Sequence, residues 1–478
     1  MLLVASAASG GEILLDDERE TEMPSQTSSN PSTNPLWFRP APRRQHLADT
    51  IDADVVIVGA GYTGLWTTYY LLKARPSLRV VLIERNVVGF GASGRNGGWA
   101  SAIFPISLSR VAQMYSHEAA LHLQAAMNAT VDEIGQVLET ENLDADFQKE
   151  GFISLARSDA QLLRVLSAVE ASTRFGLPAQ WQILDSVVAR EKVGARDVIG
   201  ALYTEHCAVI HPGKLVHGLA KLVESMGARI YENSEVKSIR PGIVSTANGT
   251  VKAETVVRAT EAFSCQQSEN RRSVIPLSSL VLATEPLPLD MRRRLHLDHR
   301  LAFNDMRHLR VYGQVTADGR LVFGGRGAPY KWGSTISDDF GDAHDKIRKS
   351  MVGFFPELAD VAITHRWGGA LGVARDWCPT VSMDKRTRIA WAGNYVGDGV
   401  ATSNLAGRIL SNLILDVDEK INSLPFVNHQ SPSWEAEPLR WFGINGGLFA
   451  AGLSDLEEKL TNHPSRTAML MEKLTGAH

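Results

Sequence analysis

The chain has 478 residues, of which 44% are apolar and 21% are charged, and its formal net charge is −4. This length suffices for two interleaved domains, and the composition is ordinary for a soluble globular protein. The negative balance offers no basic surface for a polyphosphate backbone, so nucleic acid is not an expected partner. No apolar run reaches the roughly 18 residues that a membrane span needs.

Cysteine usage and the first residues bear on the compartment. Cys207, Cys265 and Cys378 form no CxxC pair and no metal-type spacing, so neither a disulfide framework nor a metal site is expected. The start lacks the positive charge and long apolar stretch of a signal peptide, which favours a cytoplasmic location. Residues 23–46 are rich in Pro, Ser, Thr and Asn, so residues 1–49 are expected to form a flexible or surface-draped leader.

The globular part begins with a predicted β-α-β unit. Residues 54–58 form a short apolar run that is typical of a buried parallel strand. A helix is expected to follow and to end near Arg75, because Pro76 cannot continue it. Residues 79–84 then predict a second buried strand.

The turn between this first strand and the helix carries a dinucleotide-binding motif. Gly59 permits the tight turn, Gly61 lets a pyrophosphate approach the backbone, and Gly64 lets the helix pack close to the strand. The free N–H groups of the helix N-terminus suit the phosphates. Glu84 ends the second strand, where a carboxylate accepts the ribose hydroxyls and repels a 2′-phosphate, which favours FAD or NAD over NADP.

The following elements alternate between helical and extended segments. Residues 89–98 contain five glycines, so this backbone is expected to turn sharply or to lie against something flat. Residues 106–141 predict one or two helices, and residues 146–205 alternate between short strands and helices. A second α/β stretch begins at residue 211, with a helix that Gly227 closes and strands near 229–232, 236–240 and 255–259.

The C-terminal third repeats the strand–turn–helix theme. Several strands are expected within residues 280–325, and a helix over 339–354. A strand at 388–392, a turn with Gly397 and Gly399, and a helix at 400–415 then follow. A helix N-terminus behind such a turn can stabilise the negative charge of a reduced flavin, which favours FAD over NAD. An amphipathic helix near 447–460 has no basic polar face, which favours packing or a dimer contact over a membrane surface.

Taken together, these segments resemble the FAD-dependent D-amino acid oxidase superfamily, and within it the γ-glutamylputrescine oxidase and glycine/sarcosine oxidase branch. The likeness lies in residues 54–64 with Glu84, 91–98, 212–236, 256–260 and 393–408. It implies an α/β fold in which a Rossmann-like FAD-binding domain is interleaved with a mainly antiparallel α+β substrate domain. The FAD domain would comprise residues 50–145, 205–270 and 365–420, the substrate domain 146–204 and 271–364, and a C-terminal extension 421–478.

The resemblance also implies which residues hold FAD. Separate residues would contact each part of FAD: the pyrophosphate, the ribose, the isoalloxazine with its ribityl chain, the adenine and the pyrimidine end. The expected residues are Gly59, Gly61, Tyr62, Thr63, Gly64, Glu84, Arg85, Gly91, Ala92, Ser93, Gly94, Arg95, Asn96, Gly97, Gly98, Val236, Ala259, Thr260, Gly369, Gly397, Asp398, Gly399 and Val400.

Two departures from the branch concern the flavin. Some relatives attach it through a cysteine, but the matching place here is Gly369, so non-covalent FAD is expected. Those relatives also keep a lysine over the flavin that speeds the reaction with oxygen, and Val322 stands there in this chain. The acceptor is therefore either O2 or another electron acceptor.

Few side chains can be assigned to the chemistry itself. Hydride transfer from a carbon next to nitrogen to flavin N5 needs positioning and desolvation more than an acid–base pair. Arg326 could bind a substrate carboxylate or form a structural ion pair. Tyr312, Trp367 and Tyr395 could form an aromatic wall or belong to the core. His211 and His365 are alternative bases, although a lone histidine is more often structural, and Arg95 fits loop bracing better than catalysis.

The predicted function is oxidation of the C–N bond of a small amine or amino acid, with a γ-glutamylated polyamine first and glycine or sarcosine second. The alternatives are a flavin dehydrogenase with a non-oxygen acceptor and a non-catalytic FAD-binding scaffold. An NAD-dependent dehydrogenase is disfavoured by the C-terminal glycine turn, and a tRNA-modifying enzyme by the acidic balance.

Overall fold

The computed structural model describes residues 31–39 and 44–475, and two large sheets organise it. The first sheet has strand order β17-β18-β11-β1-β2-β8, with β9 and β10 attached to β11. Its strands are β1 (Thr50–Val58), β2 (Val80–Ile83), β8 (Arg229–Tyr231), β9 (Val236–Arg240), β10 (Ile243–Thr246), β11 (Thr250–Arg258), β17 (Thr380–Asp384) and β18 (Ile389–Gly393). β18, β11, β1, β2 and β8 are mutually parallel, which is the Rossmann-like arrangement that their continuous apolar runs predict.

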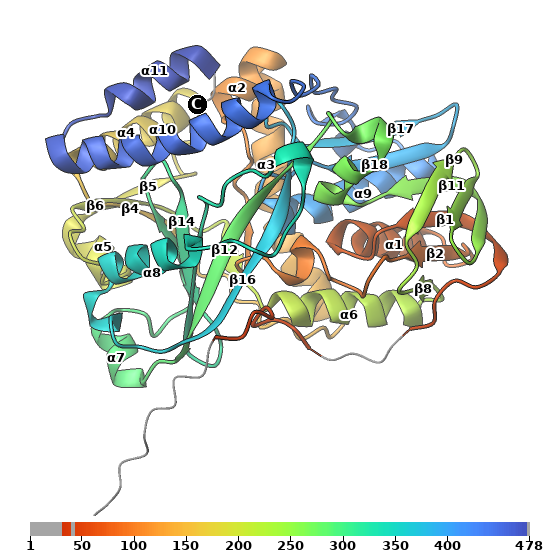
Figure 1. Cartoon of the computed structure of the whole chain (residues 1–478), viewed down its shortest axis with the longest axis horizontal. Helices are drawn as coiled ribbons and strands as arrows, with labels where there is room; N and C mark the ends of the chain where they lie inside the picture. Colours follow the sequence, from red (N-terminus) through yellow and green to blue (C-terminus); the bar gives the residue numbers. More distant parts are fainter. Residues whose placement is uncertain (1–30, 40–43, 476–478) are drawn as a thin grey trace, which may run out of the picture.

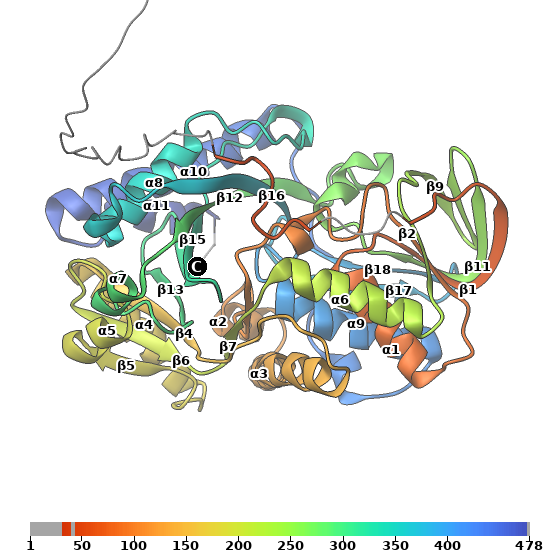
Figure 2. The same cartoon turned by 90° about the horizontal axis from the view of Figure 1, so that it is seen from below.

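Helices cover this sheet and pack on one another. They are α1 (Tyr62–Ala74), α3 (His117–Thr140), α6 (Pro212–Ser225) and α9 (Gly399–Leu415), with the short α2 (Leu108–Met114) beside α3. Figure 2 shows α1, α6, α9 and α3 gathered beside the strands of the first sheet. Trp66 lies against Gly407 where α1 and α9 cross, since any side chain at that glycine would overlap α1.

The second sheet is almost entirely antiparallel. Its order is β16-β12-β15-β14-β13-β4-β6-β5, and only β13 and β4 run parallel. The strands are β4 (Phe152–Ala156), β5 (Gln182–Asp185), β6 (Gly200–Thr204), β12 (Ile275–Pro286), β13 (Ala302–Asp305), β14 (Val311–Val315), β15 (Arg320–Gly325) and β16 (Ile363–Val373). A small third sheet pairs β3 (Trp99–Ser101) with β7 (Cys207–Val209).

The remaining helices lie on the side of this second sheet (Figure 1). They are α4 (Asp159–Arg174), α5 (Ser186–Lys192), α7 (Leu289–Arg294), α8 (Ala343–Phe354), α10 (Leu439–Thr461) and α11 (Arg466–Thr475). The chain passes from the first sheet to the second and back twice, so the predicted interleaved fold class is confirmed. None of the described helices is both long and apolar enough to cross a membrane.

Three boundaries differ from the sequence expectations. Residues 365–373 belong to β16 of the second sheet rather than to the FAD domain, because β16 pairs with β12 along most of its length. The C-terminal helix begins at Leu439, not near residue 447. Within the leader, residues 1–30 and 40–43 lie outside the described residues, but Trp37 and Leu47 are only 1% exposed and pack into the protein.

Candidate active site

A large cavity follows the carboxyl ends of β1 and β2, as expected for a ligand of a parallel sheet. Its empty volume is about 1390 Å³, including space open to solvent. Most of the predicted FAD residues line it: Gly59, Gly61, Tyr62, Thr63, Glu84, Arg85, Gly91, Ala92, Ser93, Asn96, Val236, Ala259, Thr260, Gly397, Gly399 and Val400. Gly64, Gly94, Arg95, Gly97, Gly98, Gly369 and Asp398 are not among the lining residues.

The turn from β1 into α1 favours glycine at its key positions. Gly59 has φ of +107°, and a Cβ there would overlap the carbonyl oxygen of Ala259. A Cβ on Gly61 would lie 2.8 Å from Ser93 Oγ, which itself accepts a hydrogen bond from the Tyr62 N–H. The backbone therefore forms an open cradle at the wall of the cavity, where a diphosphate can approach.

Two helix N-termini face the same cavity. α1 begins after Gly61 and α9 after Asp398, and neither has a side-chain cap or an acidic residue in its first turn. Tyr62 and Thr63 of α1 and Gly399 and Val400 of α9 line the cavity. Each terminus leaves N–H groups and the positive end of the helix dipole for an anionic group. The N-terminus of α1 suits a pyrophosphate, and the N-terminus of α9 suits the negatively charged end of a reduced flavin.

The carboxylate at the end of β2 is held by backbone groups. Glu84 Oε2 accepts a hydrogen bond from Ala60 N at 3.0 Å, and Oε1 accepts one from Asn86 N at 3.0 Å. Burial raises the pKa of Glu84 above its ordinary value, while these hydrogen bonds oppose the shift. Val236, Ser234 and Glu235 complete this end of the cavity. The carboxylate is thus fixed where a ribose would lie.

The glycine-rich segment at 89–98 is braced by Arg95. Its Nε donates to Phe90 O at 3.0 Å, and Nη1 donates to Gly368 O at 2.9 Å. Trp367 Nε1 donates in turn to Arg95 O at 2.9 Å. Arg95 therefore ties the glycine-rich segment at 89–98, the flavin loop, to β16. Its side chain lines neither cavity.

A second, smaller cavity adjoins the first through Leu371, which lines both. Its empty volume is about 290 Å³, including space open to solvent, and it is lined by Leu277, Ser278, Arg326, Gly327, Ala328, Leu371, Val373, Val396 and Leu448. Arg326 Nη2 donates to Val396 O at 2.6 Å, and the guanidinium lies 5.3 Å from the centre of the Trp377 ring. Arg326 makes no ion pair with any described residue.

Arg326 and its neighbours carry perturbed charges. Burial lowers the pKa of Arg326 to about 10, and nearby Arg310 lowers it further, whereas Asp398 raises it. Burial likewise raises the pKa of Asp398 to about 6, an effect that Arg310 and Arg326 oppose. Two cations and one carboxylate leave a net positive charge beside the second cavity. Such a place favours an anionic group on a ligand.

The three aromatic candidates lie in different places. Tyr395 lines the large cavity and shares a hydrogen bond of 3.0 Å with Thr63 Oγ1. Tyr312 and Trp367 line neither cavity and instead pack with Trp37 beneath the glycine-rich segment. Tyr312 hydrogen-bonds Ser279 at 2.9 Å. Of these three residues, only Tyr395 lines either cavity.

The two histidine candidates also lie outside both cavities. His211 Nδ1 accepts the Lys214 N–H at 3.1 Å and caps α6, and burial lowers its pKa to about 4. His365 hydrogen-bonds the adjacent Thr364. His211 thus caps a helix, whereas the hydrogen bond of His365 joins it only to its neighbour in the chain. No lysine and no cysteine is among the residues that line the two cavities.

The sequence motifs do not indicate two of the residues that line the cavities, Glu261 and Leu448. Glu261 accepts hydrogen bonds from Gly372 N at 2.6 Å and Tyr395 N at 2.9 Å, so it ties β16 to the loop before α9. Its position directly after Thr260 could have pointed to it. Leu448 of α10 enters the second cavity from the C-terminal extension, which no local motif indicates.

A dinucleotide cradle on a Rossmann-like sheet, with a second cavity against an antiparallel sheet, defines a flavin-type oxidoreductase. Comparison with known proteins gives the family. The model of the FAD dependent oxidoreductase family (DAO) matches residues 54–413, and the chain belongs to this family.

Individual relatives agree with this assignment. The chain is 31% identical to gamma-glutamylputrescine oxidoreductase of Escherichia coli (strain K12), over 80% of this chain and 88% of that protein. Glycine oxidase of Geobacillus kaustophilus (strain HTA426) is 24% identical over 78% and 96%. The crystal structure of glycine oxidase from Geobacillus kaustophilus superposes with a TM-score of 0.66 at 22% identity, covering 79% of this chain and 99% of that one. L-proline dehydrogenase from P.horikoshii gives 0.65 at 19%, covering 80% and 98%.

These findings confirm the predicted superfamily and branch, the enzyme class and FAD as the cofactor. The cavity fits FAD on its own terms, since it combines a glycine cradle, two uncapped helix N-termini and a fixed carboxylate. FAD, when bound, supplies the two-electron acceptor.

Proposed function

We propose that this enzyme oxidises the C–N bond of a small amine or amino acid that carries a carboxylate. FAD held in the large cavity would accept the hydride from the carbon next to nitrogen, and water would hydrolyse the resulting iminium. A γ-glutamylated polyamine is the first candidate substrate, and glycine or sarcosine is the second. Both kinds of substrate bear a carboxylate and an oxidisable amine.

The observation that carries this proposal is the placement of Arg326. It borders the second cavity beside Gly397 and Leu371, which line the FAD cavity. Among the described residues, Val396 O is the one group that accepts a hydrogen bond from its guanidinium, so donors remain for a substrate. A bidentate pair with a carboxylate would fix the substrate against the flavin site.

The relatives support the chemistry of the substrate. A protein 31% identical is named gamma-glutamylputrescine oxidoreductase, and others are named glycine oxidase and sarcosine oxidase subunit beta. The remaining walls of the second cavity are largely apolar, which favours a neutral, desolvated amine next to the flavin.

Two kinds of electron acceptor are candidates, namely O2 and a non-oxygen acceptor. No lysine lines either cavity, and Val322 is fully buried in β15. This favours a dehydrogenase with a non-oxygen acceptor over a fast oxidase. The three cysteines are free and buried, which suits a cytoplasmic location.

The test is an anaerobic absorbance scan of the FAD-loaded protein with a panel of amines and amino acids. Bleaching by a carboxylate-bearing amine is the expected result. Recovery in air with release of peroxide would identify an oxidase, and persistence of the bleached state a dehydrogenase. If no member of a broad panel bleaches the flavin, the protein is a non-catalytic FAD-binding scaffold and the proposal fails.

A further inference from the structure

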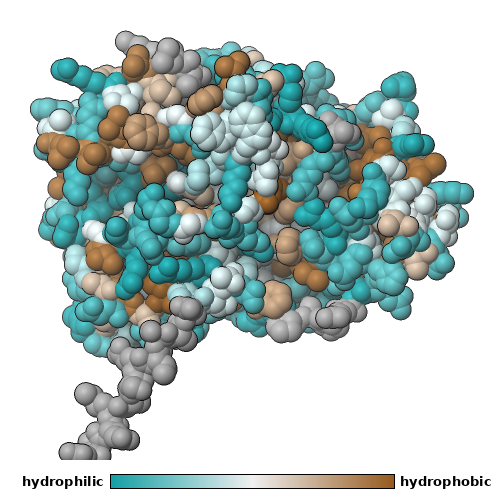
Figure 3. All heavy atoms as spheres, viewed as in Figure 1, coloured by the Kyte–Doolittle hydropathy of each residue, from teal (hydrophilic) through white to brown (hydrophobic). Residues whose placement is uncertain are grey.

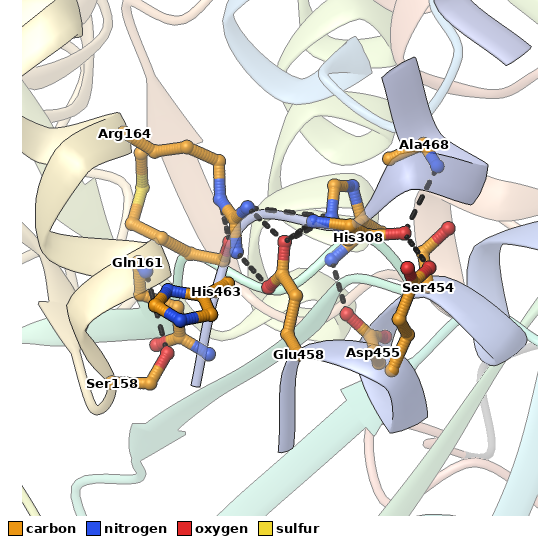
Figure 4. Close-up of polar contacts among 12 residues, drawn as sticks. Ser158, Gln161, Arg164, His308, Ser454, Asp455, Glu458, His463 and Ala468 are labelled. Atoms are coloured by element: carbon orange, nitrogen blue, oxygen red, sulfur yellow. Dashed lines mark hydrogen bonds and ion pairs between the residues drawn. The ribbon is translucent and has the colours of Figure 1, made fainter. Parts of the chain in front are cut away.

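The C-terminal helix α10 turns its polar side chains toward the protein. Glu458 accepts two hydrogen bonds of 2.7 Å from Arg164 of α4, and it also pairs with His308 Nε2 at 2.9 Å (Figure 4). Asp455 accepts the backbone N–H groups of His308 at 2.7 Å and Leu309 at 3.0 Å. These contacts fix which face of α10 is directed inward.

The opposite face of α10 is apolar and open. It carries Leu439, Phe442, Phe449, Leu453, Leu456 and Leu460, whose exposed fractions lie between 42% and 76%. Figure 3 shows apolar side chains gathered over the region of α10 and α11. Met469 and Leu470 of α11 are exposed beside them. An isolated globular protein normally directs such a face inward, so this helix is inverted relative to that rule.

The spacing of these side chains matches a helix as the occupant. With Gly446 included, they follow alternating steps of three and four residues, which are the a and d positions of a heptad. An apolar stripe limited to the a and d positions is typical of the interface between two paired helices, whereas the apolar face of a membrane-binding helix is broader. This stripe of α10 is called the seam below. The flanking residues Gly443, Ala450 and Gly452 are small, so a second helix could approach closely.

Charge also argues against a lipid surface. Helices that bind anionic membranes carry many Lys and Arg residues around the apolar face. Exposed Lys459 is the one basic side chain next to the leucines, and Glu457 is two residues before it. Asp455 and Glu458 are engaged in the inward contacts described above.

The seam is complementary to itself. In an antiparallel pairing of two copies about a two-fold axis between residues 447 and 448, each a position faces a d position. Leu439 would face the second copy's Leu456, and Phe442 the second copy's Leu453. Gly446, around whose Cβ position nothing lies within 4 Å, would receive the second copy's Phe449.

We propose that the apolar face of α10 binds a second copy of this chain through an antiparallel helix pair. In this pairing Leu439 meets Leu456, Phe442 meets Leu453 and Phe449 meets the gap at Gly446, so that twelve seam positions, six from each copy, leave water together. This inference does not depend on the substrate of the enzyme.

The first test is sedimentation velocity of the FAD-loaded protein over a range of micromolar concentrations. The wild type is expected to be a dimer, and the variant carrying Leu453→Glu and Leu456→Glu is expected to dimerise about a hundredfold more weakly or not at all. Val187→Glu, at an exposed apolar residue of α5, is the matched control and should remain dimeric. A monomeric wild type, or a dimer that survives the double substitution, overturns the proposal.

A second test keeps the seam apolar. The variant with Phe442→Cys and Leu453→Cys should form an oxidised, covalent dimer, because the native cysteines are all buried and give no background. Absence of the covalent dimer overturns the antiparallel pairing. Flotation of a monomeric wild type with phosphatidylcholine–phosphatidylglycerol vesicles would assign the face to a membrane and would equally overturn the proposal.

Discussion

The glycine cradle makes a quantitative prediction at Gly61. In Gly61→Ala the new methyl would lie 2.8 Å from Ser93 Oγ and would project from the wall that faces the diphosphate. Crowding of this kind costs about 1–3 kcal/mol. A cost of this size in the complex would raise the dissociation constant of FAD by roughly 5-fold to 160-fold.

Two clashes contribute to this loss, and a double variant separates them. Ser93→Ala removes Oγ, and the nearest remaining atom, Ser93 Cβ, would then lie at an ordinary 3.8 Å from the new methyl. Gly61→Ala combined with Ser93→Ala therefore retains only the clash with FAD. Titration of apo-protein with FAD, followed by flavin fluorescence, measures each constant. Gly353→Ala, which meets nothing within 4 Å, is the control. If the double variant binds FAD as tightly as Ser93→Ala alone, no diphosphate lies against Gly61.

Three further predictions concern the second cavity and the leader. Arg326→Met should lower kcat/KM for carboxylate-bearing amines by roughly a hundredfold or more, with partial rescue by Arg326→Lys; an equal loss for amines without a carboxylate would contradict substrate binding. The folded-state pKa of Asp398 is raised from 3.8 to about 6, so its stabilising contribution is complete below pH 3.8 and is lost as pH rises through about 6. Asp398→Asn should therefore stabilise apo-protein against urea at pH 8 by up to about 3 kcal/mol and hardly at pH 4; equal effects at both pH values would contradict this. Trp37→Ala should cost about 3–5 kcal/mol in chemical unfolding, whereas Trp37→Phe should lose little beyond its hydrogen bond to Asn96 O; a neutral Trp37→Ala would show that residues 31–39 do not support the flavin loop.

The FAD half of the site could be predicted because its signals are local. Gly59, Gly61 and Gly64 act within one turn, and the spacing to Glu84 follows from a single β-α-β unit. The same logic located the turn before α9. Glu261 could not be predicted in this way, because its role depends on contacts with β16 and Tyr395, which are more than 100 residues away in the sequence.

The substrate half depends on packing between distant segments. Arg326 was predicted as a candidate, but only the structure brings it beside Val396 and Asp398. Tyr312 and Trp367 belong to the same sheet as β15, which ends just before Arg326, yet they pack against Trp37 of the leader and line neither cavity. Strand alternation alone does not tell which face of β14 or β16 a separate segment will cover.

Two contacts to the site come from outside residues 54–413, the part that the family shares. Trp37 donates its indole N–H to Asn96 O in the flavin loop, and Leu448 forms part of the second cavity. The neighbour of Leu448, Phe449, lies on the exposed seam of α10. A partner helix on that seam would therefore act directly on a wall of the second cavity. A change at either end of the chain can therefore alter the surroundings of the site even where the residues of the FAD cradle stay the same.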